Sequence, residues 1–136
     1  MDEDDKSAVG RRHATDHAEV ERRHIERHAE VSRRHLAVHE ELCAQHDNEH
    51  NRLADQHVAE HRKATDAGLR RKAALSTLHG AQHAWMELRH ASQFLWLEAR
   101  HAVERIRIDS RHAMEFAAQE RRHAQEDRQR QSDTGT

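Results

Sequence analysis

The sequence predicts an all-α fold in which one long helix per chain shares its core with other helices. Three observations lead to this class: the chain has no proline and only four glycines, its sixteen histidines recur with a period of 11, and Val, Leu, Ile and Phe are scarce. Scarce proline and glycine leave few turns, which argues against sheets and loop-rich folds. So few large apolar residues cannot build a globular core within one helix. The net charge of −2 is nevertheless much smaller than the net charge that is typical of disordered chains.

Three columns of residues, each stepping by 11 along the chain, define the repeat. The first column is interrupted at Gly68, and its histidines are His13, His24, His35, His46, His57, His79, His90, His101, His112 and His123. The second column ends in Phe94, Arg105 and Phe116, and its histidines are His17, His28, His39, His50, His61 and His83. The third column is apolar until it fades at Gln119, and its larger members are Val20, Val31, Leu42, Leu53, Leu75, Met86, Leu97 and Ile108. Every histidine therefore lies in one of two columns.

This period fits an α-helix, because three turns of about 3.67 residues return to the same face. The three columns then form one seam, with the first histidine column at its centre. This pattern resembles the hendecad coiled coils, a structural class, over about residues 11–130. The resemblance implies a nearly straight or slightly right-handed coiled coil of parallel helices, and a homo-oligomer in which trimers or tetramers are favoured. The histidines depart from that class, which keeps aliphatic residues in these columns.

Three segments follow in order along the chain. Residues 1–10 are acidic and are expected to fray, and residues 128–136 are polar and are expected to be disordered. Between them, residues 11–127 are expected to form one continuous helix, His-rich over 13–83 and rich in aromatic and aliphatic residues over 84–108.

Gly68, at the midpoint of the chain, offers an alternative to the unbroken helix. A glycine there could end a first helix and start a helical hairpin, which would give an antiparallel bundle. Two observations favour the unbroken helix. The period crosses the gap intact, since His57 and His79 are two full periods apart, and a second helix would begin with Arg70-Arg71-Lys72, whose charge is unfavourable at a helix N-terminus.

The segment 84–108 is apolar on more than one side of the helix. Trp85 and Trp96 share a column away from the seam, and Leu88 and Leu95 lie near them in sequence. Helices that are apolar all round are usually buried. We expect a thicker oligomer core here, and a docking site for another protein is the alternative.

Six pairs of histidines spaced i, i+4 are candidate metal ligands, because residues one turn apart share a helix face. They are His13/His17, His24/His28, His35/His39, His46/His50, His57/His61 and His79/His83. Imidazole suits Zn, Cu and Ni, and two neighbouring helices could complete a four-ligand site. A seam of neutral histidines that needs no cofactor is the favoured interpretation, and metal binding or storage is the alternative.

The histidine seam also predicts a pH-sensitive assembly. Unperturbed histidine gains its charge near pH 6.5, and stacked charged rings repel one another. We expect the assembly to weaken below about pH 6.

Several functions are argued against by the sequence. It has no glycine-rich phosphate loop and no nucleophile motif, so a non-enzymatic protein is expected, and Cys43, four residues after His39, is interpreted as incidental. Nucleic-acid binding is not expected, because Arg111 and Arg122 precede Glu115 and Glu126 by four residues, the spacing of surface ion pairs. A membrane location is not expected either, and without a leader or a long apolar run the prediction is a cytoplasmic protein.

Overall fold

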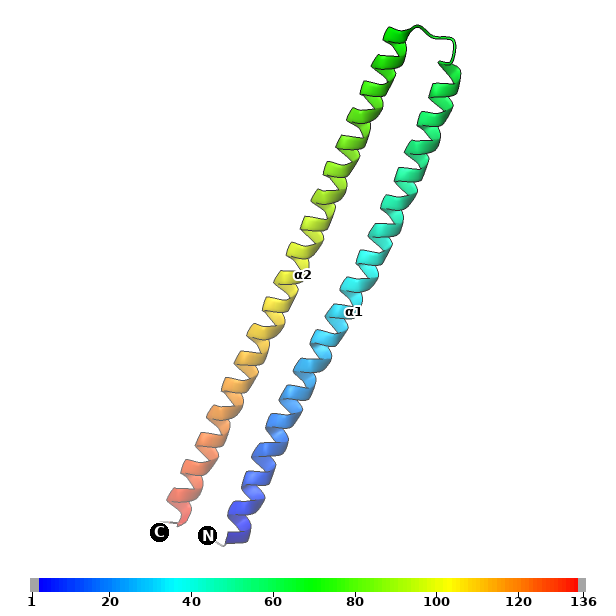
Figure 1. The fold of residues 1–136 in the computed structure, drawn as a ribbon. Coiled ribbons are helices and arrows are strands. Elements are labelled where there is room, and N and C mark those ends of the chain that lie inside the picture. The colour runs from blue at the N-terminus through cyan, green and yellow to red at the C-terminus, as the bar shows by residue number, and fades with distance from the viewer. Residues whose placement is uncertain (1–2, 135–136) are drawn as a thin grey trace. The chain divides into compact units, whose positions relative to one another are not determined.

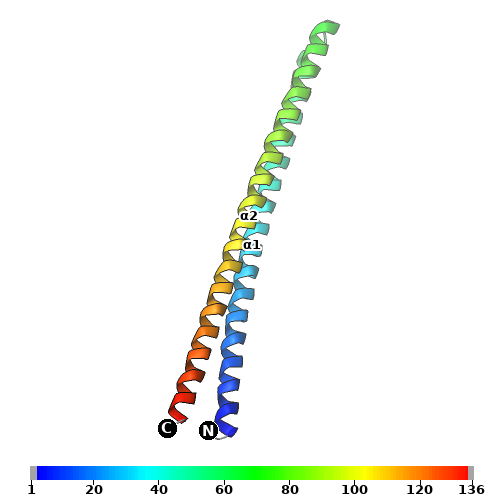
Figure 2. The ribbon, with the colours of Figure 1, turned by 90° about the vertical axis from the view of Figure 1, so that its left-hand side faces the viewer.

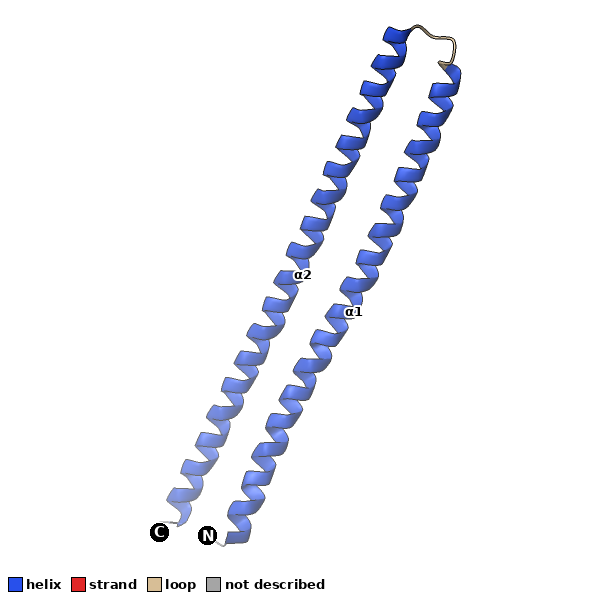
Figure 3. Ribbon diagram, in the orientation of Figure 1, coloured by secondary structure: helices blue, strands red, loops and turns tan. Residues whose placement is uncertain are grey.

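The structure is a computed structural model that describes residues 3–134. It contains two helices, α1 (Glu3–Lys63) and α2 (Leu69–Thr134), and no strand among those residues (Figures 1 and 3). The all-α prediction is confirmed. Neither helix contains, within the described residues, a stretch with the length and apolarity that a membrane span requires.

The chain forms two compact units. Unit 1 consists of residues 1–33 and 102–136, and unit 2 consists of residues 34–101. Within each unit, a segment of α1 lies antiparallel beside a segment of α2, as the views of Figures 1 and 2 both show. The histidine contacts across the helices follow one register, in which residue i meets residue 136−i; His46 stacks on His90 in unit 2, for example.

The prediction of an unbroken helix over residues 11–127 is wrong, since α1 ends at Lys63 and α2 begins at Leu69. The physical reason lies in the symmetry of the repeat. Gly68 belongs to the first column, so a reversal of the chain about Gly68 places each first-column residue opposite another residue of the same column. An antiparallel hairpin therefore keeps the period as well as a continuous helix does. Within each unit the two helix segments pack antiparallel (Figures 1 and 2), as the hairpin alternative predicts.

The last turn of α1 is closed by local hydrogen bonds. The backbone N–H of Ala64 donates to the carbonyl of Glu60 at 3.0 Å, and the Thr65 hydroxyl donates to the carbonyl of Arg62 at 2.7 Å. These bonds satisfy carbonyl groups that a helix end leaves without an intrahelical partner. The basic residues of this turn, among them Arg62 and Lys63, suit the negative end of the helix dipole.

Gly68 precedes α2 and caps its N-terminus, and it does not cap α1. Its carbonyl accepts hydrogen bonds from the N–H groups of Arg71 at 3.0 Å and Lys72 at 3.2 Å, which is the role of an N-cap residue. No described glycine has a positive φ, so the left-handed C-cap that the hairpin alternative assumed is not formed. Helix α2 starts although its first turn has no acidic residue, because an unfavourable dipole interaction of about 0.3–1 kcal/mol is smaller than what seam packing contributes.

Both outer ends are helical where fraying and disorder were predicted. Helix α1 starts at Glu3, and α2 reaches Thr134; Met1, Asp2, Gly135 and Thr136 lie outside the described residues. Packing explains why the N-terminal end is helical, because Val9 lies one full repeat before Val20 and is buried. The third column therefore begins one repeat earlier than predicted.

The aliphatic core is thin and follows the third column. The buried apolar residues are Val9, Val20, Val31, Ala64, Met86 and Leu97. Leu42, Leu53, Leu75 and Ile108, from the same column, are half-buried. Within each unit, each helix thus covers only one face of the other, and buried histidines lie beside the apolar column.

Candidate functional site

The first histidine columns of α1 and α2 meet face to face. The ring centroids lie 3.7 Å apart in His13/His123, 3.9 Å in His24/His112, 3.8 Å in His35/His101, 3.5 Å in His46/His90 and 3.6 Å in His57/His79. The two rings of each pair are stacked, with interplanar angles from 7° to 21°. All ten histidines of this column therefore pack within their own chain, in one unit or the other.

The second column lies at the margin of the seam. The rings of His17 and His39 lie 5.0 Å from those of Phe116 and Phe94, respectively. His50 and His83 are 6.2 Å apart, and His61 is exposed, with its ring edge-on to His79 at 4.9 Å. The two phenylalanines of this column on α2 thus each contact a histidine of the same column on α1.

A fourth column, three residues after the first, supplies acceptors for the stacked rings. In unit 2 the Nε2 of His46 donates to Gln93 at 2.7 Å and that of His57 to Gln82 at 2.9 Å. The partner rings face carboxylates instead, with His79 on Glu60 at 2.5 Å and His90 on Glu49 at 2.8 Å. Sequence reasoning missed this column, although it is visible as Asp16, Glu49, Glu60, Gln82, Gln93, Glu104, Glu115 and Glu126.

A fifth column, eight residues after the first, holds further carboxylates that face histidine. His17 pairs with Glu120 at 2.8 Å, His28 with Asp109 at 2.7 Å, His35 with Glu98 at 3.0 Å, His50 with Glu87 at 3.0 Å and His112 with Glu21 at 3.2 Å. Cys43 belongs to the same column, and its Sγ lies 3.7 Å from Nδ1 of His39. The seam is therefore a layered network of imidazoles and acceptors.

Three groups in this network have shifted pKa values. The hydrogen bond from His90 lowers the pKa of Glu49, and Arg89 adds to the effect. The pKa of Glu60 is lowered by hydrogen bonds from Gln56 and His79. Burial lowers the pKa of His24 from its ordinary value, and the neighbouring rings of His112 and His28 act in the same direction because charged rings repel.

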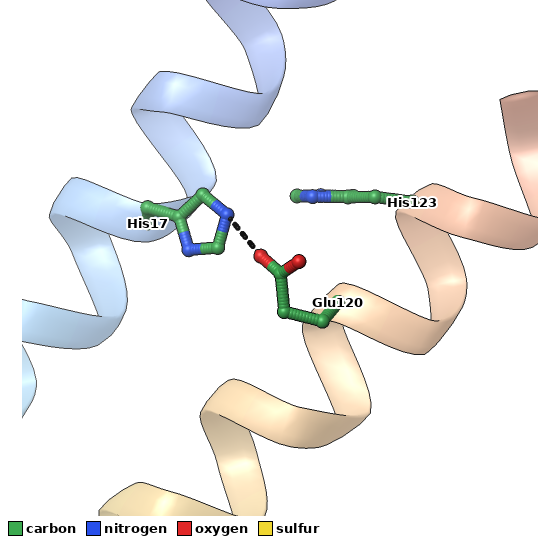
Figure 4. A group of neighbouring side chains, drawn as sticks. All are labelled: His17, Glu120 and His123. Carbon is green, nitrogen blue, oxygen red and sulfur yellow. Dashed lines mark ion pairs between the residues drawn. The ribbon is translucent and has the colours of Figure 1, made fainter.

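Two groups in unit 1 bring three potential metal ligands together. His17 of α1 meets Glu120 and His123 of α2, as Figure 4 shows, and His24 and His28 of α1 meet Asp109 of α2. In each group the ligand atoms lie within 4.8 Å of one another. Of the six predicted pairs, His24/His28 alone is complete in such a group of described residues; His17 joins residues of α2 instead of His13.

Several buried polar atoms lack a hydrogen-bond partner among the described residues. Four are ring nitrogens of unit 1, namely Nε2 of His13 and Nδ1 of His17, His24 and His112. Another is Oε1 of Gln119, whose residue is 2 % exposed. A buried polar group without a partner costs about 1–3 kcal/mol.

Replacing Gln119 with leucine is expected to stabilise the protein. The Gln119→Leu change restores the apolar third column and removes a buried, unpaired carbonyl, so the free energy of unfolding should rise by about 1–2 kcal/mol. Chemical denaturation followed by circular dichroism measures this change. The exposed Gln125→Leu variant on the same helix is the control and should shift stability by less than about 0.5 kcal/mol. A loss of stability in Gln119→Leu would contradict the prediction.

The candidate docking residues are all exposed. The exposed fractions are 67 % for Trp85, 59 % for Leu88, 72 % for Leu95 and 65 % for Trp96. Trp96 and Trp85 each line a groove along unit 2, whereas Leu88 and Leu95 line neither of these two grooves. The groove at Trp96 has a volume of about 470 Å³ and a floor of Leu42 and Leu97, and the groove at Trp85 has about 300 Å³, with Leu53 and Met86 in its lining.

Comparison with known proteins gives no match: no protein-family model, no curated protein and no solved structure is similar to this chain.

Proposed function

We propose that the protein is a non-enzymatic structural protein whose histidine-lined helices assemble with a second copy of the chain. The observation that carries this proposal is the amount of surface that the chain leaves uncovered. The chain exposes 10485 Å², whereas a monomeric globular protein of 15.9 kDa exposes about 7,400 Å². The excess of about 3,000 Å² per chain corresponds to about 6,000 Å² for a pair of chains, which is at the upper end of what obligate interfaces bury.

The surface that best fits a second copy is the face of unit 2 formed by the third column and the two tryptophans, which we call the tryptophan face. Its grooves have an aliphatic floor, and Trp96 projects beside the larger groove. A projecting side chain beside a groove is self-complementary under two-fold symmetry, because the Trp96 of each copy can enter the groove of the other. Two chains then supply four helices, a common number for a stable helical bundle.

The pH response follows from the same seam. Two stacks of unit 2, His46/His90 and His57/His79, each hold one ring on a carboxylate and one on an amide. Charging the second ring of a stack would push the two helices apart and would disturb the floor of the grooves. Assembly is therefore proposed to be sensitive to acid.

Removing the tryptophans is expected to break the assembly. Trp85→Ala/Trp96→Ala should raise the dissociation constant of the dimer by a factor of about 30 or more, because buried tryptophans carry about 2 kcal/mol or more of binding energy at interfaces. Sedimentation equilibrium of the full chain at several concentrations measures this constant. Leu88→Ala/Leu95→Ala is the matched control, since it removes two exposed apolar side chains that line neither groove. A monomeric wild-type chain, or an equal effect of the control, would overturn the proposal.

A further inference from the structure

The first of the two groups in unit 1 is built around Glu120. Its Oε1 lies 2.8 Å from Nε2 of His17, and the ring of His123 stands edge-on to that of His17 at 5.2 Å and 86° (Figure 4). Asp16 in turn lies 3.2 Å from Nε2 of His123. A carboxylate that holds one nitrogen of a ring orients the ring, as the outer carboxylates of metal-binding histidines do.

The second group repeats the histidine–carboxylate pair of the first group one period along the seam, whereas its other histidine comes from α1 and not from α2. Asp109 takes the place of Glu120 one repeat earlier on α2, and it lies 2.7 Å from Nε2 of His28, which follows His17 by one repeat on α1. The same carboxylate oxygen lies 3.7 Å from Nε2 of His24. The His24 and His28 rings are edge-on to each other, with their centroids 4.5 Å apart.

We propose that unit 1 carries two sites for a divalent first-row transition metal, one at His17, Glu120 and His123 and one at His24, His28 and Asp109. Two imidazoles and one carboxylate are a donor set that Zn²⁺ and its neighbours in the series bind, with water completing a four-coordinate shell. Ligand atoms around a tetrahedral Zn²⁺ lie about 3.4 Å apart. The atoms of each group are already within 4.8 Å of one another, so small rotations of exposed Glu120 and Asp109 close the shell.

The unpartnered nitrogens of unit 1 fit the same inference. His17 and His24, one from each group, both have a buried Nδ1 without a hydrogen-bond partner among the described residues. His13, whose Nε2 also lacks such a partner, stacks on His123 at 3.7 Å. A metal bound through Nε2 of His17, the atom that faces Glu120, would fix the orientation of that ring and leave Nδ1 as the protonated nitrogen. Metal binding would also release protons that the histidines and carboxylates share.

These sites lie within one chain and go beyond the proposed assembly. Each site joins α1 to α2 inside unit 1, whereas the tryptophan face belongs to unit 2. The number of metal ions per chain is therefore the same for a monomer and for an assembled chain. Failure of the assembly proposal would leave this number unchanged, and failure of the metal proposal would leave the dissociation constant of the dimer unchanged.

Calorimetric titration of the full, chelator-stripped chain with Zn²⁺ alone at pH 7.5 tests the proposal. The expected result is two ions per chain, with one ion lost in Glu120→Gln and one in Asp109→Asn, because each change weakens one site by a factor of ten or more. Glu98→Gln is the matched control: Glu98 pairs with His35 at 3.0 Å in unit 2, in no three-ligand group of described residues, so two ions should remain.

A second measurement separates binding from folding. The melting temperature in the presence of chelator should be nearly the same for all variants, and Zn²⁺ should raise it by several degrees in the wild type and by less in the two site variants. Three results would overturn the proposal: no binding at micromolar Zn²⁺, about six ions bound weakly by separate i, i+4 pairs, or the same loss in Glu98→Gln as in Glu120→Gln.

Discussion

Leu97→Ala is expected to lower the free energy of unfolding by about 2–5 kcal/mol, the usual cost of removing a buried leucine side chain. Leu97 is 8 % exposed and belongs to the third column, which supplies all the buried aliphatic side chains of the described residues. Because the core is so thin, the loss of one such side chain removes a large share of the aliphatic packing in unit 2. The cavity could be filled only if the two helices moved closer together, and the rigid histidine rings stacked between them resist that movement.

Chemical denaturation at fixed protein concentration measures this loss. Leu95→Ala, two residues away on the same helix, is the matched control, because Leu95 is 72 % exposed and the change in helix propensity is identical. The control should change the free energy of unfolding by less than about 0.5 kcal/mol. Equal losses in the two variants would mean that the third column is not the core.

Acidification is expected to produce the second large effect, a steep fall in melting temperature below about pH 4.5 in metal-free solution. The pKa values of Glu49 and Glu60 are lowered in the folded protein from the ordinary value of 4.5. A lowered folded pKa means that the stabilisation is fully present above pH 4.5 and is lost as the pH falls through the folded value. His90 and Arg89 of α2 face Glu49.

The carboxylates also decide how the stacks respond at milder pH. Glu60 faces His79 across the helices and has Gln56 and His57 near it on its own helix. Below about pH 6.5, where an unperturbed histidine gains a proton, a charge on the ring that faces a carboxylate is compensated. A charge on the second ring, which faces an amide, is not compensated and lies about 3.6 Å from the first. Glu49 and Glu60 therefore compensate a charge on the rings that they face, His90 and His79.

The double variant Glu49→Gln/Glu60→Gln tests this assignment. Without the two carboxylates, no charge compensates even the first proton, so the fall in melting temperature should move from below pH 4.5 towards pH 6. Thermal melts from pH 7.5 to pH 3.5 with chelator present measure the shift, and the exposed Glu40→Gln variant is the control. A melting temperature that is constant over this range, or a double variant identical to the control, would refute the assignment.

The sequence was sufficient to predict an all-helical fold and the buried members of the apolar column, because burial on a helix imposes its period on the residue pattern. Val20, Val31, Met86 and Leu97 are buried as their column requires. The turn at Gly68 could not be predicted from the period, since reversal about a member of the first column preserves it. What distinguishes the two folds is the closure of α1 and the N-cap of α2, which depend on a few local hydrogen bonds.

The acceptor columns could not be recognised from the sequence, because the spacing of acidic residues along one helix fits two arrangements. The acidic residue can pair with a residue of its own helix or with a residue of the neighbouring helix. Glu115 and Glu126 follow arginines by four residues, a spacing that predicts surface ion pairs with Arg111 and Arg122. In the structure, Glu126 lies 3.6 Å from Nε2 of His13, and Glu115 lies 3.1 Å from Arg27. An acidic residue can pair along its own helix or across to the next, and only the register of the two helices decides which. The three-ligand groups, which combine residues far apart in sequence, depend on the same register.

The register about Gly68 also determines how such a chain can change its length. An insertion of one repeat in one helix alone would offset that helix against the other, so that the outermost histidines would lose their stacking partners. Equal insertions of one repeat on both sides of the turn would add one more stacked pair and leave every existing pair in place. The stacked histidine pairs are therefore all kept only when both helices gain or lose the same number of 11-residue repeats.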